Sequence, residues 1–355
     1  MKQFIINCFK KIVRPHYQVA ILIITSCIVV LMGFKVTRRF NPLETYPEVK
    51  SVTPEKIKEW GGEPVVVNVG LYITNWHEFK IVENEFIFDG VVWFEFDPAL
   101  LSLDTIEKFS FEKGEIIKKS PPSTKLIDGK LFVEYKIRLR FTSTLSHRFF
   151  PLDDHRIFIT MVNTYVSPSE MIFRSFKSDF ATSRKNIIPA WHQVDHTVRT
   201  GYEEEFFDKF DKRKVIRYPV VVFMLDFARS GIRLIFLIFL PVFLIFFISL
   251  FWFSFDPTNT GTIIALATSS VTSLIAYRFV IQGMSPKVGY FLLSDHIFTF
   301  FLALSFVSFV FALLWVHRKK PSHSMIILRG ILFLFFHISF IALWYYLLFF
   351  WVFGA

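Results

Sequence analysis

Long runs of apolar side chains alternate with polar stretches along this chain, and five of the runs approach or reach the length of a membrane span. They cover residues 17–34, 232–255, 262–282, 296–316 and 326–353. An α-helix needs about 20 apolar residues to cross the hydrocarbon core of a bilayer. The pattern therefore predicts an N-terminal membrane helix and, near the C-terminal end, a bundle of four more.

Between the first two runs the pattern changes to the two-residue period of β-strands. Segments rich in β-branched and aromatic residues recur at residues 65–73, 86–96, 131–141, 156–163, 191–199 and 215–227. Asp128-Gly129, just before the third segment, is typical of a tight hairpin turn. One short helix is expected at residues 54–60, before the break at Gly61-Gly62. We expect an Ig-like β-sandwich over residues 38–230.

The segment 261–282 is long enough to span a membrane but is not apolar all round. On a helix, small and hydroxyl side chains gather on one side, with a single ring near the end. They are Gly261, Ala265, Thr268, Ser269, Thr272, Ala276 and Phe279. The opposite side carries Ile263, Ile264, Ala267, Val271 and Leu274. Such a polar side must face protein or water rather than lipid.

Two interpretations of the polar side follow from its residue types. Small residues four apart, such as Ala265 with Ser269 and Thr272 with Ala276, allow membrane helices to pack closely. Alternatively, the side lines a water-filled pore to which several subunits contribute, because one such helix cannot enclose water. In the second case Phe279 is the candidate constriction.

Composition agrees with a membrane protein. Of the 355 residues, 53% are hydrophobic and 47 are Phe, which is too apolar for a soluble protein of this size. The net charge of +10 is concentrated in clusters beside the apolar runs, so we expect no nucleic-acid partner. The basic loop at residues 318–320 predicts a cytosolic location, which places residues 1–16 in the cytosol and the sandwich outside.

The N-terminal run is followed by no small-x-small cleavage pattern, which favours a retained anchor at residues 17–34 over a cleaved signal peptide. Both cysteines, Cys8 and Cys27, lie at this end, so the sandwich folds without disulfides. We find no triad, P-loop or dinucleotide motif in the sequence and expect neither an enzyme nor a cofactor. His192 and His196 share one strand face without further ligands, so we expect no metal site.

Several short motifs occur in one order along residues 65–353. They are Trp93 with Asp97-Pro98, then Phe150-Pro151-Leu152-Asp153, Trp191 opening a strand, Arg229 before Leu240-Pro241, and Ser285-Pro286-Lys287-Val288-Gly289-Tyr290. In these motifs the chain resembles the pentameric ligand-gated ion channels (the Cys-loop receptor superfamily), in the prokaryotic form without the disulfide.

The resemblance implies a homopentamer in a bacterial inner membrane, with a periplasmic ligand-binding-type sandwich and a pore domain at residues 231–355. Residues 261–282 would line the pore for permeant ions, and an unknown small ligand or a proton would open it. Thr260-Gly261-Thr262 stand where cation channels of the family carry an acidic ring, so the sign of the ion stays open. The alternative is a non-conducting, membrane-anchored periplasmic sensor or interaction protein with the same fold.

The resemblance also assigns roles to individual residues. Coupling between the sandwich and the helices is expected from Pro151, Asp153, Arg229, Pro286 and Lys287, with Glu83 as a third member of an Asp153–Arg229 salt bridge. The ligand is expected near the aromatic residues Trp93, Tyr165, Tyr202, Phe206 and Phe207.

Overall fold

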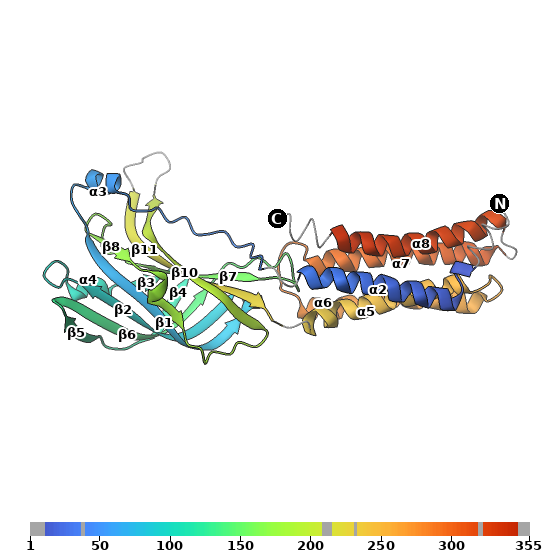
Figure 1. Cartoon of the computed structure of the whole chain (residues 1–355), viewed down its shortest axis with the longest axis horizontal. Helices are drawn as coiled ribbons and strands as arrows, with labels where there is room; N and C mark the ends of the chain where they lie inside the picture. The colour runs from blue at the N-terminus through green and yellow to red at the C-terminus, as the bar shows by residue number, and fades with distance from the viewer. Residues whose placement is uncertain (1–10, 37–39, 208–214, 231–232, 319–321, 347–355) are drawn as a thin grey trace. The chain divides into compact units, whose positions relative to one another are not determined.

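The computed structural model describes residues 11–36, 40–207, 215–230, 233–318 and 322–346. They fall into two compact units (Figure 1). The helical unit comprises Met1–Asn41, His147–Asp153 and Gly231–Ala355, and the β unit comprises Pro42–Ser146 and Asp154–Ser230.

The β unit contains a seven-stranded sheet with the order β4-β6-β2-β1-β8, in which β5 also pairs with β6 and β9 with β1. The strands are β1 (Val65–Lys80), β2 (Glu85–Phe96), β4 (Gly114–Lys119), β5 (Ser123–Ile127), β6 (Lys130–Thr142), β8 (Met171–Arg174) and β9 (Phe180–Thr182). Asp128 and Gly129 form the β5–β6 turn with φ of 47° and 79°, which confirms the predicted hairpin. Both φ values lie in the left-handed region of backbone conformation, which Asp and Gly tolerate.

A second sheet has four antiparallel strands in the order β10-β11-β7-β3. They are β3 (Ser110–Phe111), β7 (His155–Val162), β10 (Trp191–Phe206) and β11 (Val215–Arg229). Alternate residues of β11, such as Phe223 and Leu225, share a buried core with Val69 and Leu71 of β1. The predicted two-sheet architecture is therefore present, because one face of each sheet is apolar and covers the other.

The β unit also contains short helices, before and between its strands. The predicted helix is α3 (Pro54–Trp60), capped by the Thr53 side chain and ended by Gly61 at φ 86°. The others are α4 (Leu103–Glu107) and the 3-10 turns η1 (Ile81–Glu83) and η2 (Lys177–Asp179). A left-handed glycine after the last helical residue is a common way to end a helix.

The helical unit contains α2 (Pro15–Val36), α5 (Arg233–Leu250), η3 (Phe251–Ser254), α6 (Thr260–Met284), α7 (Leu293–His317) and α8 (His323–Tyr346). Of the described helices, five are long and apolar enough to cross a membrane, which is the arrangement of a membrane-embedded protein. The end of the last predicted run, residues 347–353, lies outside the described residues. Aromatic side chains fill the unit, as Phe246, Phe301 and Phe340 illustrate by their mutual ring contacts.

The N-terminal helix α2 packs against α8 within this unit. Thr25 Oγ1 donates to the Ile21 carbonyl and accepts from His337 Nδ1 at 3.2 Å. Both side chains are buried, Thr25 at 2% and His337 at 4% exposure. The Val13 carbonyl accepts a further hydrogen bond from Ser254 after α5. The helix is thus one of the packed helices of the unit.

Candidate functional site

The polar side of α6 is the side that the helical unit leaves uncovered. Every predicted pore residue is exposed, namely Gly261, Ala265, Thr268, Ser269, Thr272, Ala276 and Phe279. We call this set the α6 stripe. On the opposite side Ile263 and Leu274 are 0% exposed and Ala267 is 2% exposed. Within the described residues, the helix therefore turns these three apolar residues inwards and leaves the α6 stripe exposed, together with the apolar Ile275 and Val280.

The orientation of α6 is fixed near its C-terminal end by polar contacts that the sequence did not reveal. Arg278 forms an ion pair with Asp295 of α7 and stacks over the Phe298 ring at 5.3 Å. Asp295 also accepts a hydrogen bond from the Leu292 backbone at 2.9 Å, which caps α7. The Tyr277 hydroxyl donates to a carbonyl of α5. The only sequence signal was an arginine within an apolar run.

The loop that carries the Phe150-Pro151-Leu152-Asp153 motif belongs to the helical unit. Its backbone carbonyls at Arg148 and Phe150 accept hydrogen bonds from the first residues of α7, Leu293 (2.8 Å) and Ser294 (3.2 Å). Pro151 is buried. Main-chain hydrogen bonds therefore hold this loop to the start of α7.

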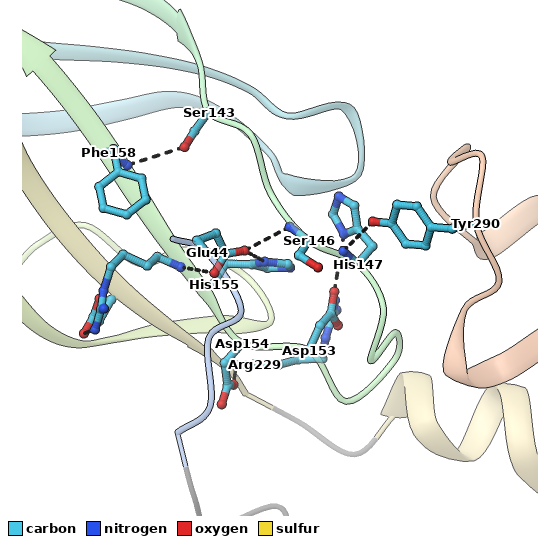
Figure 2. A network of polar contacts seen from close by, with 12 residues as sticks. Glu44, Ser143, Ser146, His147, Asp153, Asp154, His155, Phe158, Arg229 and Tyr290 are labelled. Carbon is cyan, nitrogen blue, oxygen red and sulfur yellow. Dashed lines mark hydrogen bonds and ion pairs between the residues drawn. The ribbon is translucent and has the colours of Figure 1, made fainter. Parts of the chain in front are cut away.

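A tyrosine and a buried carboxylate complete this loop (Figure 2). The His147 backbone N–H donates to the Tyr290 hydroxyl at 2.9 Å, and His147 Nδ1 lies 3.5 Å from Asp153 Oδ2. Asp153 and the His147 side chain are both 1% exposed. The buried Pro286 and the exposed Lys287 lie in the loop between α6 and α7, which also carries Tyr290. The predicted loop motifs around Asp153 and Tyr290 therefore come together.

The remaining coupling candidates lie in the β unit. At the end of β11, the Arg229 backbone donates to Asp154 at 3.2 Å, and its guanidinium lies 4.3 Å from the Trp191 ring. Glu83 pairs with Lys80 at 3.9 Å in the turn after β1. The Asp153–Arg229 salt bridge, with Glu83 as its third member, stays a prediction.

The aromatic ligand candidates are distributed over both sheets. Trp93 lies flat on Gly70, where an added Cβ would come within 2.3 Å of the indole, and it stacks on Phe132 at 5.8 Å. Trp93 is therefore held on the outward side of the seven-stranded sheet. Tyr202 is 5% exposed on β10, whereas Tyr165, Phe206 and Phe207 are exposed. One chain does not gather these residues into a single cage, and their ligand role stays a prediction.

A buried carboxylate that the sequence did not single out organises the β unit (Figure 2). Glu44 accepts hydrogen bonds from the backbone of Ser146 (3.1 Å) and Arg156 (3.0 Å) and from His155 Nδ1 (2.8 Å). Its side chain is 1% exposed. One carboxylate thus ties the N-terminal segment to the chain before and within β7.

Two carboxyl groups meet at the hairpin between β3 and β4. Burial and a hydrogen bond with Glu203 raise the pKa of Glu112 to about 8, with Glu205 adding to the rise and Lys113 opposing it. Burial and the same Glu203 raise the pKa of Tyr218. Like charges held close together cannot both ionise easily. This pair therefore binds a proton in a pH range where isolated carboxyls do not.

The Glu112 pair makes the stability of the β unit pH-dependent. The folded state holds a proton that the unfolded state, with a pKa of 4.5, releases, so the stabilisation is complete below pH 4.5 and is lost as pH rises through about 8. After allowance for solvent screening we expect a loss of about 1–2 kcal/mol. Glu112→Gln should remove this part of the slope in urea unfolding between pH 5 and 9. The exposed Glu115→Gln should leave it, and equal slopes in both variants would contradict the assignment.

Comparison of the chain with models of known protein families, and with the sequences of curated proteins, gave no match.

Proposed function

We propose that five copies of this chain form a ligand-gated ion channel, with the α6 stripe lining the pore. The observation that carries the proposal is that α6 buries its apolar side in the bundle and leaves the α6 stripe exposed. A hydroxylated side of a membrane helix is poorly solvated by lipid, so copies of the chain facing one axis and enclosing water would satisfy it. We also propose that the protein lies in a bacterial inner membrane with the β unit in the periplasm, which the basic loop at residues 318–320 and the family resemblance support.

The expected narrowing of such a pore is at Phe279. Its side chain is 73% exposed on the α6 stripe, where a ring of five phenylalanines would close the path by excluding water. Thr268, Ser269 and Thr272 would offer hydroxyl groups to ions further along. With no charged member in the α6 stripe, selection for one sign of ion would depend on groups outside it.

The loop at His147–Asp153 is the expected route of coupling. It connects β6 to β7 along the chain, and its own packing is with α7 and the α6–α7 loop. A ligand or proton that changes the β unit would therefore act on the helices through this loop. The trigger is a small ligand near the aromatic candidates or a proton, for which the Glu112–Glu203 pair is one binding place.

Cysteine accessibility tests the pore assignment. In a Cys8→Ser, Cys27→Ser background in membranes, Thr272→Cys should react with a small aqueous thiol reagent about 100-fold faster than Leu274→Cys, because only a water-exposed thiolate reacts. Leu274 is the matched control, since it lies two residues away on the buried side. Equal reaction rates of the two cysteines would show that the α6 stripe does not line a water-filled path.

Conduction distinguishes a channel from a sensor with the same fold. Purified protein in planar bilayers should pass current in some range of pH, and the thiol reagent should reduce that current in Thr272→Cys alone. Reaction at Thr272→Cys without current at any pH would favour the non-conducting alternative. A pentameric stoichiometry alone would fit both.

A further inference from the structure

Residues 42–60, which we call the strap, cross the outer side of the four-stranded sheet before β1 begins. The strap follows α2 in the chain and ends in α3, and Figure 1 draws it as a blue coil leading to that helix. Lys50 and Tyr202 exchange two backbone hydrogen bonds, of 3.0 and 2.9 Å, as an antiparallel bridge. Because β10 is the edge strand of this sheet, the strap uses backbone groups that an edge leaves unpaired.

Side chains seat the strap on an apolar patch of the same sheet. Val49 packs on a buried cluster formed by Val162, Tyr218, Val220, Val222 and Met224. Tyr46 contacts the Arg156 guanidinium at 4.6 Å and that of Arg199 at 3.9 Å. At the far end, Trp60 meets the Tyr202 ring edge to face at 5.3 Å. Stacked cations and aromatic edges add specificity to apolar burial.

Charge complementarity supports the same contact. Lys50 forms an ion pair with Glu204, which also accepts from Arg217 Nε at 2.6 Å. Hydrogen bonds from Lys50 and then Arg217 lower the pKa of Glu204. The charged contacts at Glu44 and Lys50 thus flank the contacts of Tyr46 and Val49, and Trp60 adds an aromatic contact at the far end.

The sheet has space for the strap at one glycine. A Cβ at Gly201 would lie 2.2 Å from the Lys50 carbonyl oxygen and 2.6 Å from a Val49 methyl group. These atoms belong to Lys50, which forms the bridge, and to the preceding Val49. Any larger residue at position 201 would therefore displace the strap. The glycine is therefore part of a fitted seat.

The seat lies where the β10–β11 hairpin most needs support. Strand β7 pairs with β11 from Val220 to Phe227. Within the described part of the sheet, residues 215–218 pair with β10 alone. A two-stranded ribbon is at most marginally stable in water. The strap contacts this two-stranded ribbon at Tyr202 and Glu204, and these contacts add to the pairing between β10 and β11.

We propose that the outer side of the four-stranded sheet is a peptide-binding surface whose resident ligand is the strap, and that the seated strap holds the β10–β11 ribbon in place. Extended peptides bind sheets in this way, through main-chain pairing at an edge and pockets for alternate side chains. A strap that leaves its seat frees the ribbon to move. The strap thereby connects the state of the N-terminal segment to the mobility of one hairpin.

Hydrogen exchange of the full-length protein tests this proposal. In Tyr46→Ala/Val49→Ala, amides at residues 202–206 and 215–218 should exchange at least about tenfold faster, with β1 and β2 unchanged. Adding a peptide of residues 41–60 in excess should restore protection, whereas the peptide with the same two substitutions should not. Unchanged ribbon exchange, equal acceleration in both sheets, or no rescue by the native peptide would overturn the proposal.

A covalent lock provides the converse test. In the background without native cysteines, Lys50→Cys/Tyr202→Cys places thiols on a hydrogen-bonded antiparallel pair, whose Cα separation of about 5.5 Å suits a disulfide. Oxidation should slow ribbon exchange several-fold relative to the reduced protein. Equal exchange in the two redox states would show that the strap does not restrain the ribbon.

Discussion

Glu44→Ala is expected to lower the free energy of unfolding of the β unit by about 3 kcal/mol, because it leaves buried donors without their acceptor. The donors are the backbone N–H groups of Ser146 and Arg156 and the ring of His155, all within 3.1 Å of the carboxylate. Loss of the same contacts also releases the first part of the strap. Urea unfolding of the protein in detergent, followed by tryptophan fluorescence, measures the effect.

Two variants separate the buried contacts from a general effect of lost charge. Glu44→Gln keeps one acceptor oxygen, so we expect a smaller loss of about 1 kcal/mol. Glu48→Ala removes an exposed carboxylate of the same strap and should change stability by less than about 0.5 kcal/mol. If Glu44→Ala resembled Glu48→Ala, the buried network would not stabilise the fold.

Asp295→Ala is expected to destabilise the helical unit by about 3 kcal/mol, because the Arg278 guanidinium loses its carboxylate in a largely buried place. The side chains are 12% and 27% exposed, so water replaces the lost partner only in part. The change also removes the acceptor for the Leu292 backbone at the start of α7. Unfolding in mixed micelles, followed by helical circular dichroism, measures the loss.

The contribution of charge to this pair is tested by two further changes. Asp295→Asn retains an acceptor for Leu292 and should lose about 1–2 kcal/mol. Reversing both charges, with Arg278→Asp and Asp295→Arg, should recover part of the stability lost in Arg278→Asp alone. An additive double variant would mean that the two side chains are not coupled.

The sequence predicted those helices and strands whose pattern of apolar residues follows from the burial of the element itself. The membrane-length helices and the long strands β2, β6 and β11 carry runs or alternations that are set by burial of the element itself. By contrast, β5 is exposed at every position, so no alternation exists to detect. Strands β8 and β9 are short and pair in parallel with β1, about 100 residues away in the chain, a contact that local sequence does not encode.

The same distinction applies to the candidate site. The residues of the α6 stripe could be grouped on one side of the helix from the sequence, since their size and polarity repeat at a period of 3.6. Their role as pore lining stays a prediction. The Arg278–Asp295 pair, the Glu44 network and the Glu112–Glu203 pair were not, because each joins residues from separate elements. Glu44 in particular resembles any acid in a polar linker until the chain folds around it.

The packing of α2 on α8 changes what surrounds the bundle. Lipid chains cannot hydrogen-bond, so an outer helix that carries a histidine would be poorly solvated by them. Here the Thr25 hydroxyl of α2 is hydrogen-bonded to the His337 ring, so α2 solvates one side of α8 in place of lipid. On this side of α8, a helix of the same chain takes the place that lipid would otherwise occupy. One such helix is present for every copy of α8, whatever the composition of the surrounding bilayer.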